Sequence, residues 1–150
     1  KSRDNSRTPV QWDDTPNGGF TTGTPWIPVA GNYREINAEA ALRDQNSVFY
    51  HYQKLIRIRK MYDIVTEGTY ELIAKDDPNI FAYLRHGSNE KLLVINNFYG
   101  TEAAFTLPDS LAPDEWKAEV LLTNDEEREG LQNMTLRPYE SIVYRLTKPC

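Results

Sequence analysis

The chain has 150 residues, 39% hydrophobic and 26% charged, which is typical of an ordinary globular domain. Its net charge of −5, with no basic stripe interleaved with aromatic residues, argues against a nucleic-acid partner. No apolar run approaches the roughly 20 residues that a membrane-spanning helix needs, so we expect no membrane partner.

The segment from residue 1 to about residue 45 is rich in proline and glycine, which excludes a long helix or a central strand. A loop of this length inside a compact domain is uncommon unless it is functional, often as an active-site loop or lid. We therefore predict an ordered, functional loop that lies against another part of the protein. Its apolar residues are costly to leave in water, namely Val10, Trp12, Phe20, Trp26, Ile27, Val29, Tyr33 and Ile36.

Apolar residues recur at helical spacing between about Asn46 and Tyr62, which predicts one amphipathic helix near 47–62. Asn46 or Ser47 can supply the N-cap oxygen. Basic residues gather in the last turns, where they complement the helix dipole. A nucleic-acid or membrane helix is an alternative, but a charged outer face is the simpler interpretation.

Beyond Gly68 the pattern changes to short β runs separated by Pro, Gly and Asx turns. This spacing predicts an antiparallel sandwich or meander, with the doubly apolar run Leu92–Ile95 in the middle of a sheet. We interpret the acidic stretch Asp125–Glu129 as a solvated turn. The expected strands are Thr69–Ile73, Ile80–His86, Lys91–Phe98, Glu102–Leu107, Trp116–Thr123 and Ser141–Leu146.

The sequence favours neither a metal site nor a disulfide framework. Its single cysteine, Cys150, is consistent with a reducing compartment, so we expect the cytoplasm. His51 and His86 have no Cys or acidic partner at ligand spacing, and we expect both at the surface. We predict no cofactor. The polar start, without a methionine or an apolar leader, indicates part of a longer polypeptide.

Residue types and spacing alone lead to a β-rich domain with a functional loop, because no pair of opposed carboxylates is evident. A resemblance extends this interpretation. The tract from Ser2 to Asp14 closely resembles α-glucosidases of the α-amylase family of glycoside hydrolases (family 13). Further matching tracts are Gly19–Thr21, Pro25–Ile27, Glu35–Asn37, Ser47–Tyr50, Lys91–Phe98 and Leu136–Glu140.

The resemblance implies a mainly β chain. Residues 1–65 would be the remnant of a catalytic (β/α)8 barrel, comprising its last βα loop and last helix. Residues 66–150 would be the C-terminal antiparallel β-sandwich domain. The resemblance covers almost the whole chain.

Within the family the chain is most similar to trehalose-6-phosphate hydrolases and oligo-1,6-glucosidases, and less so to sucrose isomerases. Ser6 and the run Asn96–Gly100 favour the first group. The resemblance thus implies an intracellular α-glucosidase that cleaves trehalose 6-phosphate to glucose and glucose 6-phosphate by a retaining mechanism. Hydrolysis of isomaltose and dextrin oligosaccharides is the alternative.

The resemblance also assigns Arg3 to substrate binding, where a guanidinium can donate paired hydrogen bonds to sugar hydroxyls and a neighbouring carboxylate. An exposed arginine near a chain terminus is the alternative. The nucleophile, the acid and the second aspartate of the family belong to earlier barrel strands, so we expect no catalytic residue here and no activity of the chain alone. Any calcium site would also lie upstream.

Two other functions are compatible with the sequence. The first is a carbohydrate-binding module with Trp12, Trp26 or Trp116 as a stacking platform. The second is a structural domain that mediates association through apolar surface. Without a barrel, the helix face of Val48, Tyr52, Leu55 and Ile56 would be partly bare, which predicts self-association.

Overall fold

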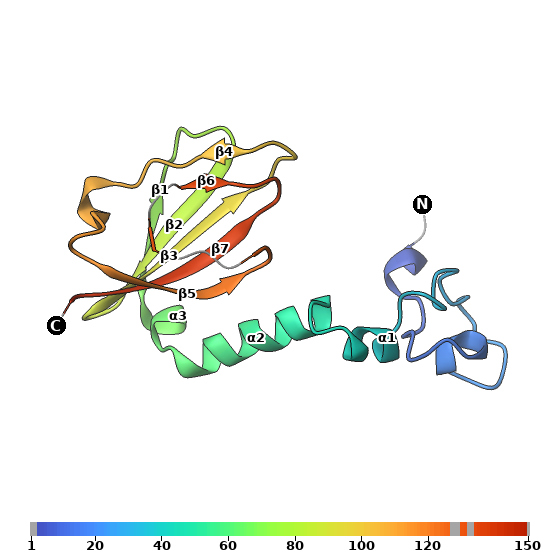
Figure 1. Ribbon diagram of the computed structural model, residues 1–150. Coiled ribbons are helices and arrows are strands. Elements are labelled where there is room, and N and C mark those ends of the chain that lie inside the picture. The colour runs from blue at the N-terminus through green and yellow to red at the C-terminus, as the bar shows by residue number, and fades with distance from the viewer. Residues whose placement is uncertain (1–2, 127–129, 132–133, 150) are drawn as a thin grey trace. The chain divides into compact units, whose positions relative to one another are not determined.

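The computed structural model describes residues 3–126, 130–131 and 134–149, so Cys150 lies outside the described residues. The chain divides into two compact units, Lys1–Lys54 and Leu55–Cys150. The first contains the proline- and glycine-rich segment, and the second contains the β-rich region (Figure 1). None of the helices in the described ranges is long and apolar enough to cross a membrane.

The first unit consists of loops and short helical turns. It contains two 3-10 turns, η1 (Arg3–Ser6) and η2 (Pro16–Gly19), and the six-residue helix α1 (Ala38–Arg43). The composition did not predict α1. Asn37 caps this helix, because its Oδ1 accepts a hydrogen bond from the Ala40 amide at 2.8 Å.

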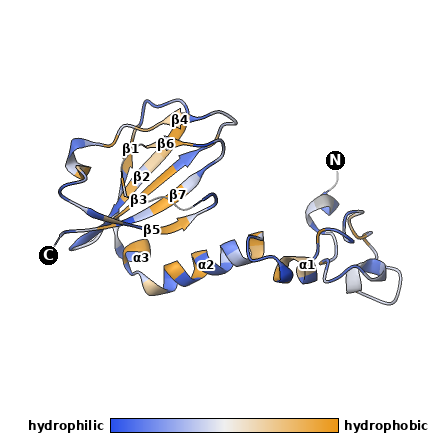
Figure 2. Ribbon diagram, in the orientation of Figure 1, coloured by the Kyte–Doolittle hydropathy of each residue, from blue (hydrophilic) through white to orange (hydrophobic). Residues whose placement is uncertain are grey.

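The predicted amphipathic helix is confirmed as α2 (Val48–Met61). Figure 2 shows hydrophobic and hydrophilic residues along this helix. The Ser47 hydroxyl, one of the two expected caps, donates to the Ala41 carbonyl at 2.7 Å. The apolar face is uncovered as predicted, since Val48, Tyr52, Leu55 and Ile56 are 73%, 62%, 39% and 52% exposed.

A further short helix, α3 (Ile64–Glu67), was not predicted. The Arg85 guanidinium secures it by donating to the carbonyl oxygens of Ile64 at 3.0 Å, Gly68 at 2.7 Å and Thr66 at 3.3 Å. Carbonyls at a helix end generally lack partners within the helix, although that of Ile64 also accepts from the Gly68 amide at 3.1 Å. Gly68 permits the close approach, because an added Cβ there would lie 2.5 Å from the Ile64 carbonyl oxygen.

Five antiparallel strands form the main sheet, in the order β1-β2-β3-β7-β5. Each agrees with its predicted range to within one residue at either end. The run Leu92–Ile95 lies in β3, the central strand, as predicted. The bounds are β1 (Thr69–Ile73), β2 (Ile80–His86), β3 (Glu90–Asn97), β5 (Lys117–Thr123) and β7 (Ser141–Thr147).

A second, two-stranded antiparallel sheet joins β4 (Ala103–Ala104) to β6 (Thr135–Leu136). The turn η3 (Asp109–Leu111) follows β4. Only two residues of the expected strand 102–107 pair, and β6 was not predicted. Residues of both sheets share one core, which confirms the predicted β-sandwich. This core contains Ile73, Ile80, Ala82, Leu84, Leu93, Ile95, Ala103, Phe105, Leu111, Leu131, Leu136, Ile142, Tyr144 and Leu146.

Strand β5 carries a β-bulge against β7. Val120 pairs with Tyr144 and Leu122 pairs with Val143, so Leu121 is an extra residue on β5. Because successive side chains of β7 point to opposite faces, the bulge places Leu122 on the face of Val143 rather than on the core face of Tyr144.

Asn97 is the last residue of β3, lies at one end of the sandwich and is 2% exposed. Its amide donates to the carbonyl oxygens of Thr101 at 2.7 Å and Arg137 at 2.9 Å. Its Oδ1 accepts from the Tyr99 amide at 3.0 Å. Two tracts that carry the family resemblance therefore meet at this buried amide.

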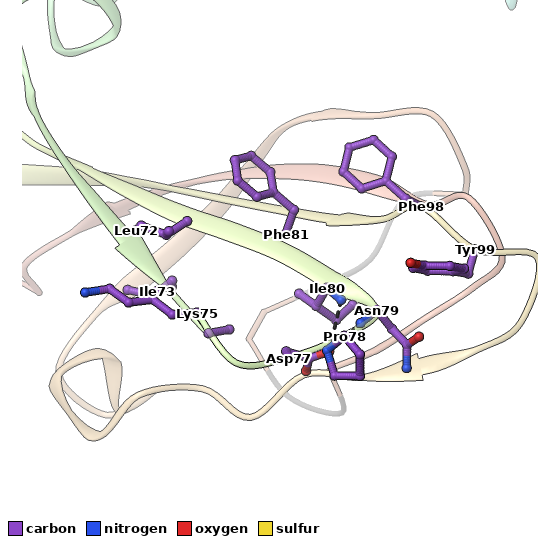
Figure 3. Close-up of a pocket in the computed structure, with 11 residues that line it drawn as sticks. Leu72, Ile73, Lys75, Asp77, Pro78, Asn79, Ile80, Phe81, Phe98 and Tyr99 are labelled. Atoms are coloured by element: carbon purple, nitrogen blue, oxygen red, sulfur yellow. Dashed lines mark hydrogen bonds between the residues drawn. The ribbon is translucent and has the colours of Figure 1, made fainter.

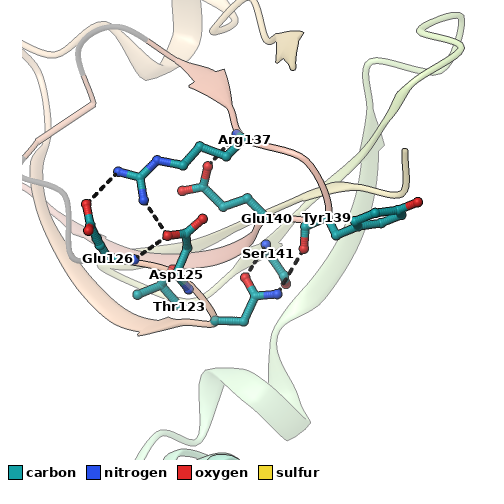
Figure 4. A network of polar contacts seen from close by, with 8 residues as sticks. Thr123, Asp125, Glu126, Arg137, Tyr139, Glu140 and Ser141 are labelled. Atoms are coloured by element: carbon teal, nitrogen blue, oxygen red, sulfur yellow. Dashed lines mark hydrogen bonds and ion pairs between the residues drawn. The ribbon is translucent and has the colours of Figure 1, made fainter. Parts of the chain in front are cut away.

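A second polar cluster surrounds Arg137 (Figure 4). Its guanidinium pairs with Asp125 and, at 3.3 Å, with Glu126. The bond to Asp125 is the main reason that the pKa of Arg137 is raised. The prediction of a solvated acidic turn agrees with Glu126, whose side chain is 84% exposed, whereas Asp125 is 30% exposed and pairs with Arg137. Residues 127–129 of that stretch lie outside the described residues.

Candidate functional site

The proline- and glycine-rich segment is held together by backbone hydrogen bonds within the first unit. The Trp12 amide donates to the Gly18 carbonyl at 2.8 Å, which closes a turn. The amides of Ala38 and Glu39 donate to the carbonyls of Gln11 and Trp12, each at 2.9 Å. The segment is therefore ordered, as predicted, and α1 is tied to its first half.

The turn inside this loop depends on Asp13. Its carboxylate accepts hydrogen bonds from the hydroxyl and the amide of Thr15. These bonds lower the pKa of Asp13, and the bond from the Thr15 hydroxyl has the largest effect. Gly19 follows with φ 66°, and a Cβ there would lie 2.5 Å from an Asp13 carboxylate oxygen. Glycine is therefore needed for both its backbone conformation and its small size.

A hollow of about 550 Å³ opens on the first unit. Asp4 and Arg7 form an ion pair at 3.7 Å there, and the Trp26 side chain is 99% exposed. Aromatic surface beside a few polar groups suits a sugar, which has apolar C–H faces and many hydroxyls. The lining residues are Asp4, Arg7, Thr8, Pro9, Val10, Phe20, Pro25, Trp26 and Ile27.

Arg3, the predicted substrate-binding residue, lies in η1 next to Asp4 in the chain. It is exposed and is not among the residues that line the hollow. Its carbonyl accepts from the Ser6 hydroxyl at 3.0 Å, which stabilises the turn. Sequence reasoning selected Arg3 alone and missed Asp4, Arg7 and Phe20, although all belong to matching tracts.

The hollow supplies groups for binding rather than for bond cleavage. Asp4 is the single carboxylate among the described residues that line it. Glycoside hydrolysis ordinarily requires two carboxyl groups across the scissile bond. Within the described ranges, no group of three or more His, Cys, Asp or Glu could hold a metal ion. His86 Nε2 instead lies 2.6 Å from Glu71 Oε2.

The three tryptophans differ in exposure. Trp12 is 55% exposed, and Trp26 almost fully. Trp116 packs against the core, and its indole Nε1 donates to the Ser110 carbonyl at 3.1 Å. The ammonium groups of Lys91 and Lys148 lie 4.7 and 4.2 Å from its ring centroid. The alternative in which Trp116 is an exposed sugar platform is therefore not supported, because its ring already contacts the core and two ammonium groups.

Two family models match the chain in succession. Residues 1–68 match the catalytic domain of alpha amylase. Residues 80–143 match the C-terminal domain of the alpha-amylase SusG. The first match includes the hollow, and the second covers most of the sandwich.

Comparison with curated proteins finds similar sequences. The chain is 97% identical over 150 residues to a trehalose-6-phosphate hydrolase of Bacillus subtilis (strain 168), covering 100% of the chain and 27% of that protein. It is 51% identical over 152 residues to an oligo-1,6-glucosidase of Parageobacillus thermoglucosidasius, covering 99% of the chain and 26% of that protein. The chain thus spans about a quarter of the length of these relatives.

A solved structure shows the same fold. The crystal structure of Bacillus licheniformis trehalose-6-phosphate hydrolase matches with a TM-score of 0.91 and 58% identity. The match covers 99% of this chain and 27% of that structure.

Proposed function

We propose, from its matches to two α-amylase models, that the chain is the C-terminal part of an α-glucosidase of this family that hydrolyses trehalose 6-phosphate to glucose and glucose 6-phosphate. The observation that carries the proposal is the 97% identity to a trehalose-6-phosphate hydrolase along the whole chain. Identity to the oligo-1,6-glucosidase is 51%.

In this proposal residues 1–65 complete a catalytic (β/α)8 barrel as its last βα loop and last helix, and residues 66–150 form the domain that follows. Active sites of such barrels lie among the βα loops. The hollow on the first unit, with its aromatic and charged lining, supports a position of this loop beside the substrate.

Arg3 binds the sugar in this proposal. The structure describes no hydrogen bond or ion pair of its guanidinium, which leaves five N–H donors for sugar hydroxyls and a neighbouring carboxylate. The nucleophile and the acid come from polypeptide outside these residues, and the whole enzyme retains the anomeric configuration through a glycosyl-enzyme intermediate.

The proposed substrate is a small, phosphorylated saccharide. A phosphate ester carries about −1.5 to −2 charges at neutral pH. Such a charge is costly to move through a lipid bilayer, so the proposed location of the enzyme is the cytoplasm. The chemistry needs only carboxyl groups and water, and the proposal includes no cofactor.

A substrate comparison tests this function. In a full-length protein that contains these 150 residues, kcat/KM for trehalose 6-phosphate should exceed that for trehalose and isomaltose by about a hundredfold or more. The proposed function requires groups that bind the phosphate, and sugars without a phosphate would leave these groups unpaired. A preference for isomaltose would assign the alternative, oligo-1,6-glucosidase. Glucose release at an enzymatic rate by the 150-residue chain alone would disprove that the catalytic acids lie elsewhere.

Arg3 can be tested in the same full-length protein. Arg3→Lys keeps the charge but loses the planar fork, and kcat/KM should fall about tenfold or more. Arg34→Lys is the matched control, because Arg34 is also exposed in the first unit and donates to Tyr33 Oη at 3.3 Å. Equal activity of the two variants would remove Arg3 from the substrate site.

A further inference from the structure

A second hollow, of about 430 Å³, lies on the sandwich, and all its lining residues belong to the second unit (Figure 3). It is formed by the end of β1, the turn into β2, the start of β2 and the residues after β3. Its size falls in the usual range of small-molecule sites. Its lining includes Asp77, Asn79, Phe81, Phe98 and Tyr99.

Three aromatic rings border this hollow. Phe81, Phe98 and Tyr99 are 42%, 65% and 51% exposed. The rings of Phe81 and Phe98 have centroids 6.3 Å apart and an interplanar angle of 50°, so they do not stack face to face on each other. Their exposed faces can therefore contact a flat apolar surface such as the C–H face of a pyranose.

Polar groups at the rim complement the rings. Within the described residues, the Asn79 side-chain amide and the Tyr99 hydroxyl have no hydrogen-bond partner, whereas the Lys75 ammonium points away from both (Figure 3). The carboxylate of Asp77 also lines the hollow, which favours an uncharged ligand over an anion. Hydroxyl groups of a sugar could exchange hydrogen bonds with Asn79 and Tyr99.

The backbone around the hollow is held in place before any ligand binds. Asp77 Oδ1 accepts from the amides of Asn79 at 2.9 Å and Ile80 at 3.0 Å, which fixes the β1–β2 turn. The Tyr99 amide donates to the buried Asn97, and the Tyr99 carbonyl accepts from Tyr139 at 3.0 Å. A preformed site loses less conformational entropy on binding.

We propose that this hollow binds a glucosyl unit of a small neutral oligosaccharide. The rings of Phe81 and Phe98 contact the sugar's apolar face, while Asn79 and Tyr99 bind its hydroxyls. The choice of a glucosyl ligand rests on the proposed function, whereas the site itself rests on the geometry of the sandwich.

A titration of the 150-residue chain with maltotriose, followed by amide NMR shifts, tests the site. Shifts should saturate with a millimolar Kd and centre on residues 75–81 and 98–99. Phe98→Ala should raise Kd about three- to tenfold, through loss of one stacking face. Tyr70→Ala is the matched control, because Tyr70 is 54% exposed on β1 but does not line the hollow, and its Kd should be unchanged.

Absence of saturable shifts at these residues would overturn the proposal, as would equal effects of Phe98→Ala and Tyr70→Ala. The titration is then repeated on a full-length protein. Loss of the shifts there would also overturn it, because the hollow would be an internal contact. None of these results changes which substrate the full-length enzyme cleaves, so this proposal and the proposed function fail independently.

Discussion

At the scale of single residues, Asn97 shows how one side chain can hold several segments. Its side-chain nitrogen donates to two backbone carbonyls and its Oδ1 accepts from one backbone amide, and the residue is only 2% exposed. A buried polar group that loses its partner retains the full cost of desolvation. The end of the sandwich therefore depends on this side chain more than on the exposed aromatic residues beside it.

We expect Asn97→Ala to lower the free energy of unfolding by about 2–4 kcal/mol, because three backbone groups lose their partner. Urea unfolding measures this change. Asn96→Ala is the matched control, since Asn96 is partly exposed, its amide donates to the Phe81 carbonyl at 3.1 Å and its Oδ1 accepts from the Ser141 hydroxyl at 2.6 Å. It should cost about 1 kcal/mol. Similar losses for both variants would contradict the role of Asn97.

Asp13 provides a residue-scale prediction about pH. Its pKa in the folded chain is lowered from the ordinary 3.8, mainly by the Thr15 hydroxyl. The contribution of the carboxylate to the turn is therefore present above 3.8 and is lost as pH falls through the lower folded pKa. Carboxyl ¹³C NMR should give a midpoint below 3.8, and Thr15→Val should move it upward. The control Thr24→Val, in the same segment, should not, and an unchanged midpoint in Thr15→Val would reject this explanation.

At the scale of elements, sequence patterns predicted those helices and strands that have enough residues to show a period. Helix α2 and the five strands of the main sheet fall into this class. The short elements α1, α3 and β6 were missed, because elements of six, four and two residues show no period and depend on tertiary partners. Asn37 before α1 was the one local signal, as an N-cap residue.

The helix α3 depends on the guanidinium of Arg85, which is distant in sequence. Arg85→Lys should speed amide hydrogen exchange across residues 64–68 and lower the free energy of unfolding by about 1–2 kcal/mol, because an ammonium lacks the separate guanidinium nitrogens that reach the three carbonyls. Arg57→Lys, at an exposed position of α2, serves as the control. Unchanged exchange in Arg85→Lys would show that packing of Ile64 alone holds α3.

At the scale of the whole molecule, the family resemblance predicted more of the domain organisation than the residue patterns did. The tract beginning at Ser2 indicated the α-amylase family, and the family models match in the expected order. The hollows could not be predicted, since each combines residues that only the folded backbone brings together. The contacts of Trp116 with Lys91 and Lys148 could not be predicted either, because these lysines are distant in sequence.

The uncovered face of α2 leads to a prediction about association. Light scattering should give a mass above the monomer's 17.3 kDa as concentration rises. Ile56→Lys should weaken association about tenfold, because a buried isoleucine is worth about 1.5–3 kcal/mol. Arg57→Ala, also on α2, should leave it unchanged. A mass of 17.3 kDa at every concentration would exclude self-association.

The extra residue on β5 has a consequence for how the sandwich meets other chains. Strand β5 is an outer strand of the main sheet, and such strands can recruit a foreign strand through their free backbone groups. The bulge at Leu121 shifts the register, so the backbone donors and acceptors before Leu121 do not align with those after it. An incoming strand could pair with β5 on one side of Leu121 but not on both sides. The bulge therefore disfavours edge-to-edge association of sheets at β5.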